Sequence, residues 1–349
     1  GEARRLEGLR PAAVLQSDWA DATDLRKRLH SARDEFNGVR MTMVALQEEL
    51  DWCCYSAFGI DIEATFESPE AIEPLAAEHR PFELLLARAF LAGHSTDYWF
   101  QANRRSPCSI LPQSYGERTR ARLDSRLARI STGTALQLLE TPDCKRKWEP
   151  VDQSQEVQRA CSGWLRDRLE EAIRTRSSPA SVRRIAAAIQ DDSKFLAAAE
   201  VLEGRQDFSL EGVVANLMVP ESVPLHPYHV YTDTGLAKRA AWERTWELQR
   251  REDLKEDVGK ILAPPEYSQG SRGKSTDFLR SEYWQSRGRL DVPKERFIAF
   301  TEVPGREGRD ALFGWAGWTA KERVRALLAL DEHLEDEGVP REDRIGVLD

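Results

Sequence analysis

Apolar residues recur at alternating spacings of four and three positions between residues 25 and 57. Ten residues follow this pattern: Leu25, Leu29, Ala32, Phe36, Val39, Met43, Leu46, Leu50, Cys53 and Ala57. The spacing places them on one stripe of an α-helix and is typical of a coiled-coil seam. Thr23 or Asp24 can cap this helix and Gly59 can end it, and at about 1.5 Å per residue it should span roughly 50 Å. Such a stripe must be buried against a partner, which can be another helix of this protein, another subunit or a region outside this chain.

The pattern along the rest of the chain changes near residue 220. Before this point we expect helices at 81–93, 118–130 and 155–174, and shorter ones that start near Ser181, Ser193 and Ser209. After it we expect strands at 223–231, 296–301 and 312–315, helices at 236–258, 277–285 and 319–337, and a loop at 263–274. Thr319 and Glu322 have the spacing of a capping box.

These signals predict a mainly α protein with a smaller α+β C-terminal part. The length of 349 residues suggests two or three folding units. We expect a long heptad helix that acts as a spacer at 1–60, a helical domain with a basic segment at 61–219, and a small α+β domain at 220–349.

The composition, with 41% hydrophobic and 31% charged residues, is that of a folded globular protein. There is no run of about 18 apolar residues and no apolar signal stretch at the start, so we expect a cytoplasmic protein without a membrane segment. A start at Gly1 instead of Met suggests a piece of a longer protein. The five cysteines form no CxxC pair, and we expect them to be reduced and mostly buried.

Charge is unevenly distributed along the chain. The net charge is −9, which argues against a dedicated nucleic-acid-binding protein because phosphate neutralisation needs Lys and Arg. Residues 101–190, however, carry 17 Lys and Arg against 10 Asp and Glu, or +7, which leaves −16 for the rest of the chain. The sequence therefore contains one basic segment within an acidic protein.

Two groups of cations in this segment are candidates for contact with nucleic acid. Arg118, Arg122, Arg126 and Arg129 fall on one stripe of the expected helix, where they can follow a phosphate backbone. The alternative is a solvated helix face on which they pair with Glu117 and Asp124. The second group is Lys145, Arg146 and Lys147, which lie beside Trp148, an aromatic residue that can stack on a base or belong to the core.

The chemistry of methyl transfer is absent from the sequence. Adenine methylation needs a glycine-rich turn for S-adenosylmethionine and an Asp/Asn-Pro-Pro-Tyr/Phe loop for the flipped base, and neither motif occurs. The segment 263–267, Ala-Pro-Pro-Glu-Tyr, lacks the polar first residue. His226 and His229 could join a metal site only if a third ligand converged on them, and ordinary hydrogen-bonded histidines are the simpler interpretation. We therefore expect no catalytic, cofactor-binding or metal-ligating residue in this chain.

Several stretches resemble the C-terminal region of DNA adenine methyltransferases of BREX and phage growth limitation systems, the PglX family. The first is Met-Val-Ala-Leu-Gln-Glu-Glu-Leu-Asp-Trp at 43–52, followed by Tyr55 and Gly59. Further stretches lie at 80–88, 139–148, 242–252, 291–297 and 314–318. The resemblance covers most of the chain from about residue 25, and extends more loosely to type IIG restriction-modification enzymes.

The resemblance implies a part in host-DNA modification and defence against phage. The catalytic motifs of the family would lie upstream of Gly1, so S-adenosylmethionine is expected to bind a methyltransferase domain of the same polypeptide and no cofactor is expected here. Two roles remain open for this chain. It can position DNA through a weak contact of the basic segment, or it can be a docking scaffold for other BREX proteins, for which the heptad helix and the acidic remainder are suited.

Overall fold

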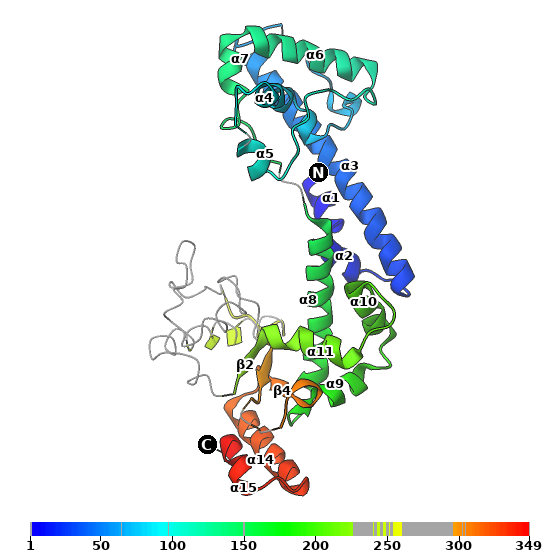
Figure 1. Ribbon diagram of the computed structural model, residues 1–349, viewed down its shortest axis with the longest axis vertical. Helices are drawn as coiled ribbons and strands as arrows, with labels where there is room; N and C mark the ends of the chain where they lie inside the picture. Colours follow the sequence, from blue (N-terminus) through cyan, green and yellow to red (C-terminus); the bar gives the residue numbers. More distant parts are fainter. Residues whose placement is uncertain are drawn as a thin grey trace. The chain divides into compact units, whose positions relative to one another are not determined.

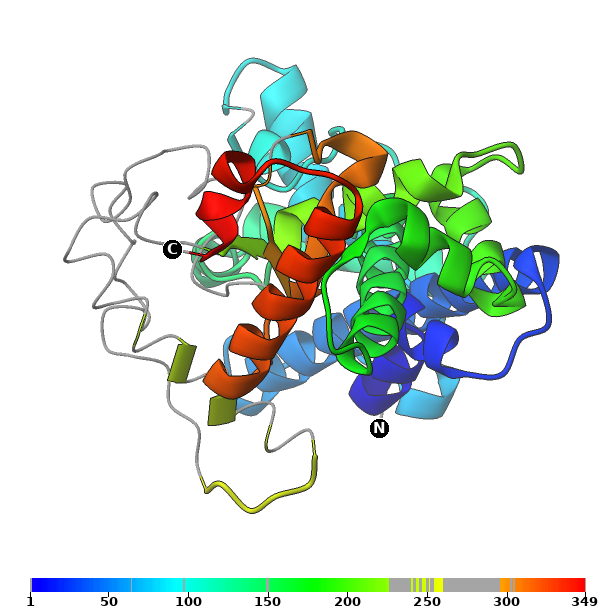
Figure 2. The same ribbon diagram turned by 90° about the horizontal axis from the view of Figure 1, so that it is seen from below.

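The structure is a computed structural model of the chain, and it describes residues 2–63, 65–96, 98–148, 151–225, 296–301, 303 and 305–348, together with some residues between 240 and 259. The chain is drawn in Figure 1 and, turned by 90°, in Figure 2. It divides into two compact units: unit 1 comprises Gly1–Trp19 and Thr23–Ala160, and unit 2 comprises Ala20–Ala22 and Cys161–Asp349. The boundary between the two compact units thus lies near residue 160. The division into 1–60, 61–219 and 220–349 stays a prediction.

Unit 1 is built from helices. They are α1 (Glu2–Gly8), α2 (Pro11–Gln16), α3 (Ala22–Ala57), the short turns η1 (Pro69–Ala71) and η2 (Ala77–His79), α4 (Pro81–Leu91), α5 (Tyr98–Ala102), α6 (Glu117–Thr132) and α7 (Thr134–Leu139). The boundary between the units falls within α8 (Gln153–Arg174). The predicted mainly α fold is confirmed, and none of the described helices is long and apolar enough to cross a membrane.

Helix α3 is the long helix that the heptad pattern predicts. Its 36 residues are continuous and end at Ala57. Two residues later the positive φ of Gly59, 70°, lets the Ile60 amide donate to the Tyr55 carbonyl oxygen at 2.8 Å. The helix begins at Ala22, so Thr23 and Asp24 lie in its first turn and do not cap it.

The predicted stripe of α3 is buried only in its first half. Leu25, Leu29, Phe36 and Val39 are buried, whereas further along Leu50 is 57% exposed and Cys53 and Ala57 are exposed too. The second half buries a different face, which carries Val44, Ala45, Glu48, Glu49, Trp52 and Tyr55. The reason is that α6, α7 and the turns before α4 and α8 supply the packing partners on that side, including Leu75, Leu123, Ile130, Leu136 and Trp148. The prediction of one buried stripe is therefore wrong beyond Val39.

This change of face gives a direct stability test. Replacing Leu50 with Ala should lower the free energy of unfolding by less than about 1 kcal/mol, because the side chain already meets solvent. Replacing Trp52 with Ala should lower the free energy of unfolding by about 3–5 kcal/mol, because Trp52 is fully buried although it lies only two residues away. Urea unfolding of both variants measures the difference. A loss above about 2 kcal/mol for Leu50→Ala would show that its stripe is covered in solution.

Unit 2 combines helices with a small sheet. Its elements are β1 (Ala180–Ser181), α9 (Val182–Ile189), α10 (Ser193–Glu203), α11 (Leu210–Met218), η3 (Val219–Glu221), β2 (Ser222–Pro224), β3 (Phe297–Ala299), η7 (Gly308–Asp310), β4 (Leu312–Trp315), α14 (Ala320–Asp336) and α15 (Arg341–Leu348). The strand order is β1-β4-β3-β2, with β2 and β3 parallel and the other pairs antiparallel. The strands expected at 296–301 and 312–315 and the Thr319–Glu322 capping box are confirmed. The strand expected at 223–231 is present as β2 up to Pro224, and its residues 226–231 lie outside the described residues.

Helix α14 covers one face of this sheet. Ala326, Leu330 and Leu334 of α14 join Val223 and Ile298 of the strands in one core. Side chains alternate between the faces of a strand, so Gly314 shares the face of its β3 partner Ile298. Trp318 lies on that glycine: a Cβ atom added to Gly314 would stand 2.3 Å from the Trp318 ring. The Gly-Trp-Ala-Gly-Trp stretch therefore packs a tryptophan where only glycine leaves room.

The exposure of the cysteines differs from the expectation. Cys53, Cys54 and Cys144 are exposed and Cys161 is buried, so the expectation of mostly buried thiols is wrong. Cys53 is exposed because its stripe of α3 points outward.

Some predictions fall on residues that the structure does not describe. These are the helix 277–285, the loop 263–274, the histidines 226 and 229, and most of the helix 236–258.

Candidate nucleic-acid interface

The four arginines predicted to follow a phosphate backbone lie on α6. Gly116 and Gly133 flank this helix, and its spacing places Leu123, Leu127 and Ile130 in the core. The arginines differ sharply in exposure. The side chain of Arg118 is 83% exposed and that of Arg129 is partly exposed, whereas Arg122 and Arg126 are buried. One stripe thus contains two surface cations and two interior ones.

Glu49 of α3 holds the buried pair. Its carboxylate lies 3.2 Å from Nε of Arg122 and 2.8 Å from Nη2 of Arg126. The Arg126 guanidinium also lies over the Trp52 ring, 5.0 Å from its centroid. Buried charges are tolerated only when they are paired, so Glu49 is the reason that two arginines can enter the interior.

The remaining α6 contacts come from the segment that follows α3. Glu67 lies 3.0 Å from Arg118 and 3.1 Å from Arg122, while Arg129 meets Asp61 at 2.5 Å and Glu63 at 3.2 Å. These carboxylates are not Glu117 and Asp124, the partners considered from the sequence. A sequence signal for them exists: residues 41–79 contain nine Asp and Glu and no Lys or Arg. This acidic segment neutralises much of the basic one.

Lys145, like Arg126, is a predicted cation that lies in the interior. Its side chain is 2% exposed, and its Nζ atom lies 2.6 Å from Glu140, 2.8 Å from Asp51 and 3.8 Å from Glu48. Tyr55 donates its hydroxyl to Glu140 at 2.8 Å. Burial raises the pKa of Glu48 from 4.5 to about 7, although Lys145 acts to lower it. Lys145 is therefore the counter-ion of a buried carboxylate cluster and not a surface contact.

Arg146 and Lys147 remain at the surface. The Arg146 guanidinium lies over the ring of buried Trp148 at 4.6 Å, so this tryptophan supports the turn from within the core. Neither Arg146 nor Lys147 forms an ion pair with a residue that the structure describes, and the same holds for exposed Arg104. These three side chains are thus exposed cations of the basic segment that no described carboxylate neutralises.

A buried ion pair links the two turns that carry these cations. Arg80 donates to the Arg146 carbonyl oxygen at 2.9 Å and to Glu83 at 2.5 Å, and Arg105 meets the same carboxylate at 2.8 Å. The turn at 104–105 therefore lies next to the turn at 146–147. The Glu83 carboxylate pairs with both Arg80 and Arg105, so this group of three side chains has a net positive charge. The sequence reasoning missed Arg80, Glu83, Arg104 and Arg105 because the contacts join distant segments.

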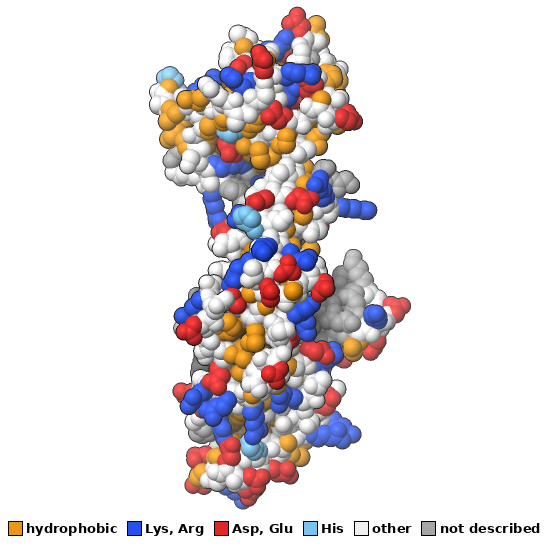
Figure 3. Space-filling view, turned by 90° about the vertical axis from the view of Figure 1, so that its right-hand side faces the viewer, with side chains coloured by type: hydrophobic (Ala, Val, Ile, Leu, Met, Phe, Trp, Pro, Cys, Tyr) orange, Lys and Arg blue, Asp and Glu red, His pale blue; other side chains and the backbone are white. Residues whose placement is uncertain are grey.

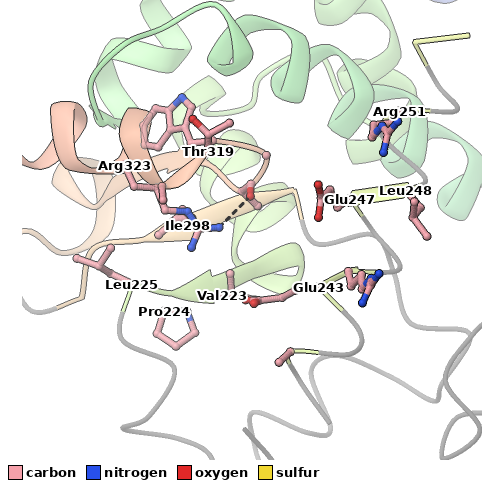
Figure 4. Close-up of a pocket in the computed structure, with 16 residues that line it drawn as sticks. Val223, Pro224, Leu225, Glu243, Glu247, Leu248, Arg251, Ile298, Thr319 and Arg323 are labelled. Atoms are coloured by element: carbon pink, nitrogen blue, oxygen red, sulfur yellow. Dashed lines mark hydrogen bonds between the residues drawn. The ribbon is translucent and has the colours of Figure 1, made fainter. Parts of the chain in front are cut away.

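Unit 2 contains a cavity of about 740 Å³ between its sheet and a helical segment (Figure 4). Arg323 reaches across its wall and donates to the Ala316 carbonyl oxygen at 3.3 Å. The charged residues around it are of both signs: Glu243, Glu247, Arg244, Arg251 and Arg323. The cavity therefore has no clear preference for an anion or a cation. Within the described ranges, no three His, Cys, Asp or Glu side chains are placed to hold a metal ion.

The fold and the charges together define a mainly helical protein in which five of the seven predicted cations are bound by carboxylates of the same chain. The chain belongs to the family described as Domain of unknown function (DUF7008), whose model matches residues 43–348. It is also 34% identical over 341 residues to the adenine-specific methyltransferase PglX of Streptomyces coelicolor. This match covers 93% of the chain but 27% of that relative's length. The predicted resemblance to PglX is confirmed, and no solved structure matches.

Proposed function

We propose that this chain is the C-terminal, non-catalytic part of an adenine-specific DNA methyltransferase of the PglX type, and that it helps to position DNA during BREX phage defence. The similarity to PglX supports DNA as the partner. On this proposal another part of the same polypeptide binds S-adenosylmethionine and carries out methyl transfer. Because its substrate is host DNA, we place the protein in the cytoplasm.

The observation that carries the DNA contact is the pair of exposed turns at 104–105 and 146–147. Arg104, Arg146 and Lys147 reach solvent. Arg105 lies beside them and pairs with Glu83, which it shares with Arg80. Contacts of this kind position a duplex without reading its sequence, and they give weak, salt-sensitive binding. On the face drawn in Figure 3 acidic and basic side chains are interspersed.

Removal of the three exposed cations tests the contact. The variant Arg104→Ala/Arg146→Ala/Lys147→Ala should flatten the slope of log K against log salt by as much as about 2.7, because each lost phosphate contact removes about 0.9. Fluorescence anisotropy with a short unmethylated duplex measures the slope at several salt concentrations. Both proteins should give the same circular dichroism spectrum, because these side chains are exposed.

A matched variant controls for total charge. Arg10, Arg28 and Arg33 are exposed cations of unit 1 in other elements, and changing all three to Ala removes the same charge. Its salt slope should stay close to that of the unmodified chain. Equal slopes for all three proteins, or no binding at low salt, would contradict DNA positioning by these turns.

A docking scaffold for other BREX proteins is the second candidate. The outward stripe of α3 favours it, because Leu50, Cys53, Cys54 and Ala57, with Phe58 just after the helix, form an exposed, uncharged surface over about two helical turns. If the salt slopes show no contact at the turns, this role becomes the better account.

A further inference from the structure

The segment after α3 has its apolar side chains in solvent and acidic side chains against α6. We call Phe58–Glu63 and Thr65–Ser68 the strap. Its apolar side chains point to solvent, with Phe58 81% and Ile62 79% exposed and Phe66 half exposed. A segment of this kind gains little from the hydrophobic effect. Something other than apolar burial must hold it on the protein.

Polar contacts to the α6 arginines hold the strap. Asp61 and Glu63 pair with Arg129, and Glu67 pairs with Arg118 and Arg122. The Thr65 carbonyl oxygen accepts a hydrogen bond from Arg126 at 3.0 Å. The strap thus occupies the arginine stripe with carboxylates, which are the groups that most resemble phosphates in charge and geometry.

The strap combines exposed ion pairs with the more buried pairs Asp61–Arg129 and Glu67–Arg122. Arg118 and Glu63 are largely exposed, so their ion pairs contribute little and are screened by salt. A hollow of about 330 Å³ lies between Thr65, Phe66 and Glu67 on one side and α6 on the other. Segments with few buried apolar contacts open at the smallest cost in free energy. The Glu49–Arg126 pair, in contrast, joins α3 to α6 and is buried.

We propose that the strap is an acidic cover whose release from α6 frees Arg118 and Arg129 from their carboxylate partners, so that both can bind the phosphate backbone of a nucleic acid. The proposal rests on the DNA-positioning function and adds regulation to it. With the strap in place, DNA meets the turns at 104–105 and 146–147. When phosphates displace the strap carboxylates, the contact extends along α6, while Glu49 keeps Arg122 and Arg126 in the core.

Neutralising the strap should therefore strengthen binding. In the variant Asp61→Asn/Glu63→Gln/Glu67→Gln, three arginines lose their strap partners. Two of them, Arg118 and Arg129, become available to phosphates, so we expect the salt slope to steepen by as much as about 1.8 and the affinity at low salt to rise about tenfold or more. The matched control Glu70→Gln/Asp124→Asn/Asp143→Asn makes the same change in charge at acidic residues of unit 1 that form no ion pair with the α6 arginines. An equal effect in both variants would overturn the proposal, because total charge alone would then explain it.

A second polyanion separates the strap from the DNA function. Short polyphosphate should bind the strap variant more tightly than the control in the same assay. If polyphosphate shows this difference and no protein binds DNA, the DNA-positioning function fails while the strap stands. If neither polyanion distinguishes the two variants, the strap proposal is wrong.

Hydrogen exchange on the unmodified chain tests release of the strap without relying on a substituted protein that must still fold. The Glu67 amide bonds to Glu49 at 2.9 Å and should be protected in the free protein. Adding polyphosphate should speed exchange in the strap by a factor of several, with the core of α3 unchanged. Unaltered exchange in the strap at saturating polyphosphate would contradict its release.

Discussion

Replacing Lys145 with Met lowers the free energy of unfolding by about 3–5 kcal/mol, because breaking a buried ion pair leaves charge without compensation. Lys145 is the only cation within 4 Å of Glu48, Asp51 and Glu140 among the described residues, and it also lies 5.6 Å from the centroid of the Tyr55 ring. Methionine fills a similar volume, so the loss reports charge more than packing. Urea unfolding followed by tryptophan fluorescence measures it.

The pH dependence identifies the cause of this loss. Glu48 has a pKa raised to about 7 in the folded state, so its protonation contributes stability that is fully present below 4.5 and is lost as the pH rises through 7. Without Lys145 that pKa rises further, since the attraction that lowers it is gone. The Lys145→Met loss should therefore be larger at pH 8 than at pH 5, and adding Glu48→Gln should recover part of it. An equal loss at both pH values would attribute the effect to packing.

Replacing Gly314 with Ala should cost about 3 kcal/mol or more, at the upper end of what overpacking a core does. The new Cβ would stand 2.3 Å from the Trp318 ring and 3.2 Å from Phe300. Trp318 cannot move aside easily because it is itself buried in the core that includes Ala326. Thermal unfolding of the full chain should show a lower transition for the part of the chain that contains the sheet.

The same substitution elsewhere in unit 2 is the control. Gly163 lies within α8, and a Cβ added there would have no other atom within 4 Å. Gly163→Ala should stabilise the protein by roughly 0.5–1 kcal/mol, since glycine disfavours a helix interior. Combining Gly314→Ala with Trp318→Leu should recover part of the loss. A Gly314→Ala protein as stable as the parent would mean that Trp318 does not lie on Gly314 in solution.

The sequence predicted those parts of the fold that depend on local periodicity. The heptad spacing located α3, the Thr319–Glu322 spacing located the start of α14, and short β-branched or aromatic runs located β3 and β4. Periodicity cannot tell which neighbour covers a helix. For this reason the change of buried face at Val44 was not predictable from α3 alone.

The candidate interface was predicted less well, for a related reason. The four-residue spacing correctly placed Arg118, Arg122 and Arg126 along α6, but their partners Glu49 and Glu67 lie 51 to 77 residues earlier in the chain. Local inspection finds only Glu117 and Asp124. The absence of Lys and Arg from residues 41–79 was the available signal, because an acidic segment beside a basic one can neutralise it. Exposure of Arg104, Arg146 and Lys147 became visible only once the other cations were paired.

The order of strands in unit 2 has a consequence for how this chain can vary. The chain leaves β2 at Pro224 and re-enters the same sheet as its parallel neighbour β3 at Phe297, which is in register with Ser222. The two points are therefore within about 10 Å of each other, from a strand spacing of about 4.8 Å and two residues of rise. Any connection long enough for a parallel crossover can join them, and each doubling of its length adds only about 0.6 kcal/mol of closure entropy. For this reason the length of this connection can change at little cost in closure entropy while β2 and β3 keep their pairing.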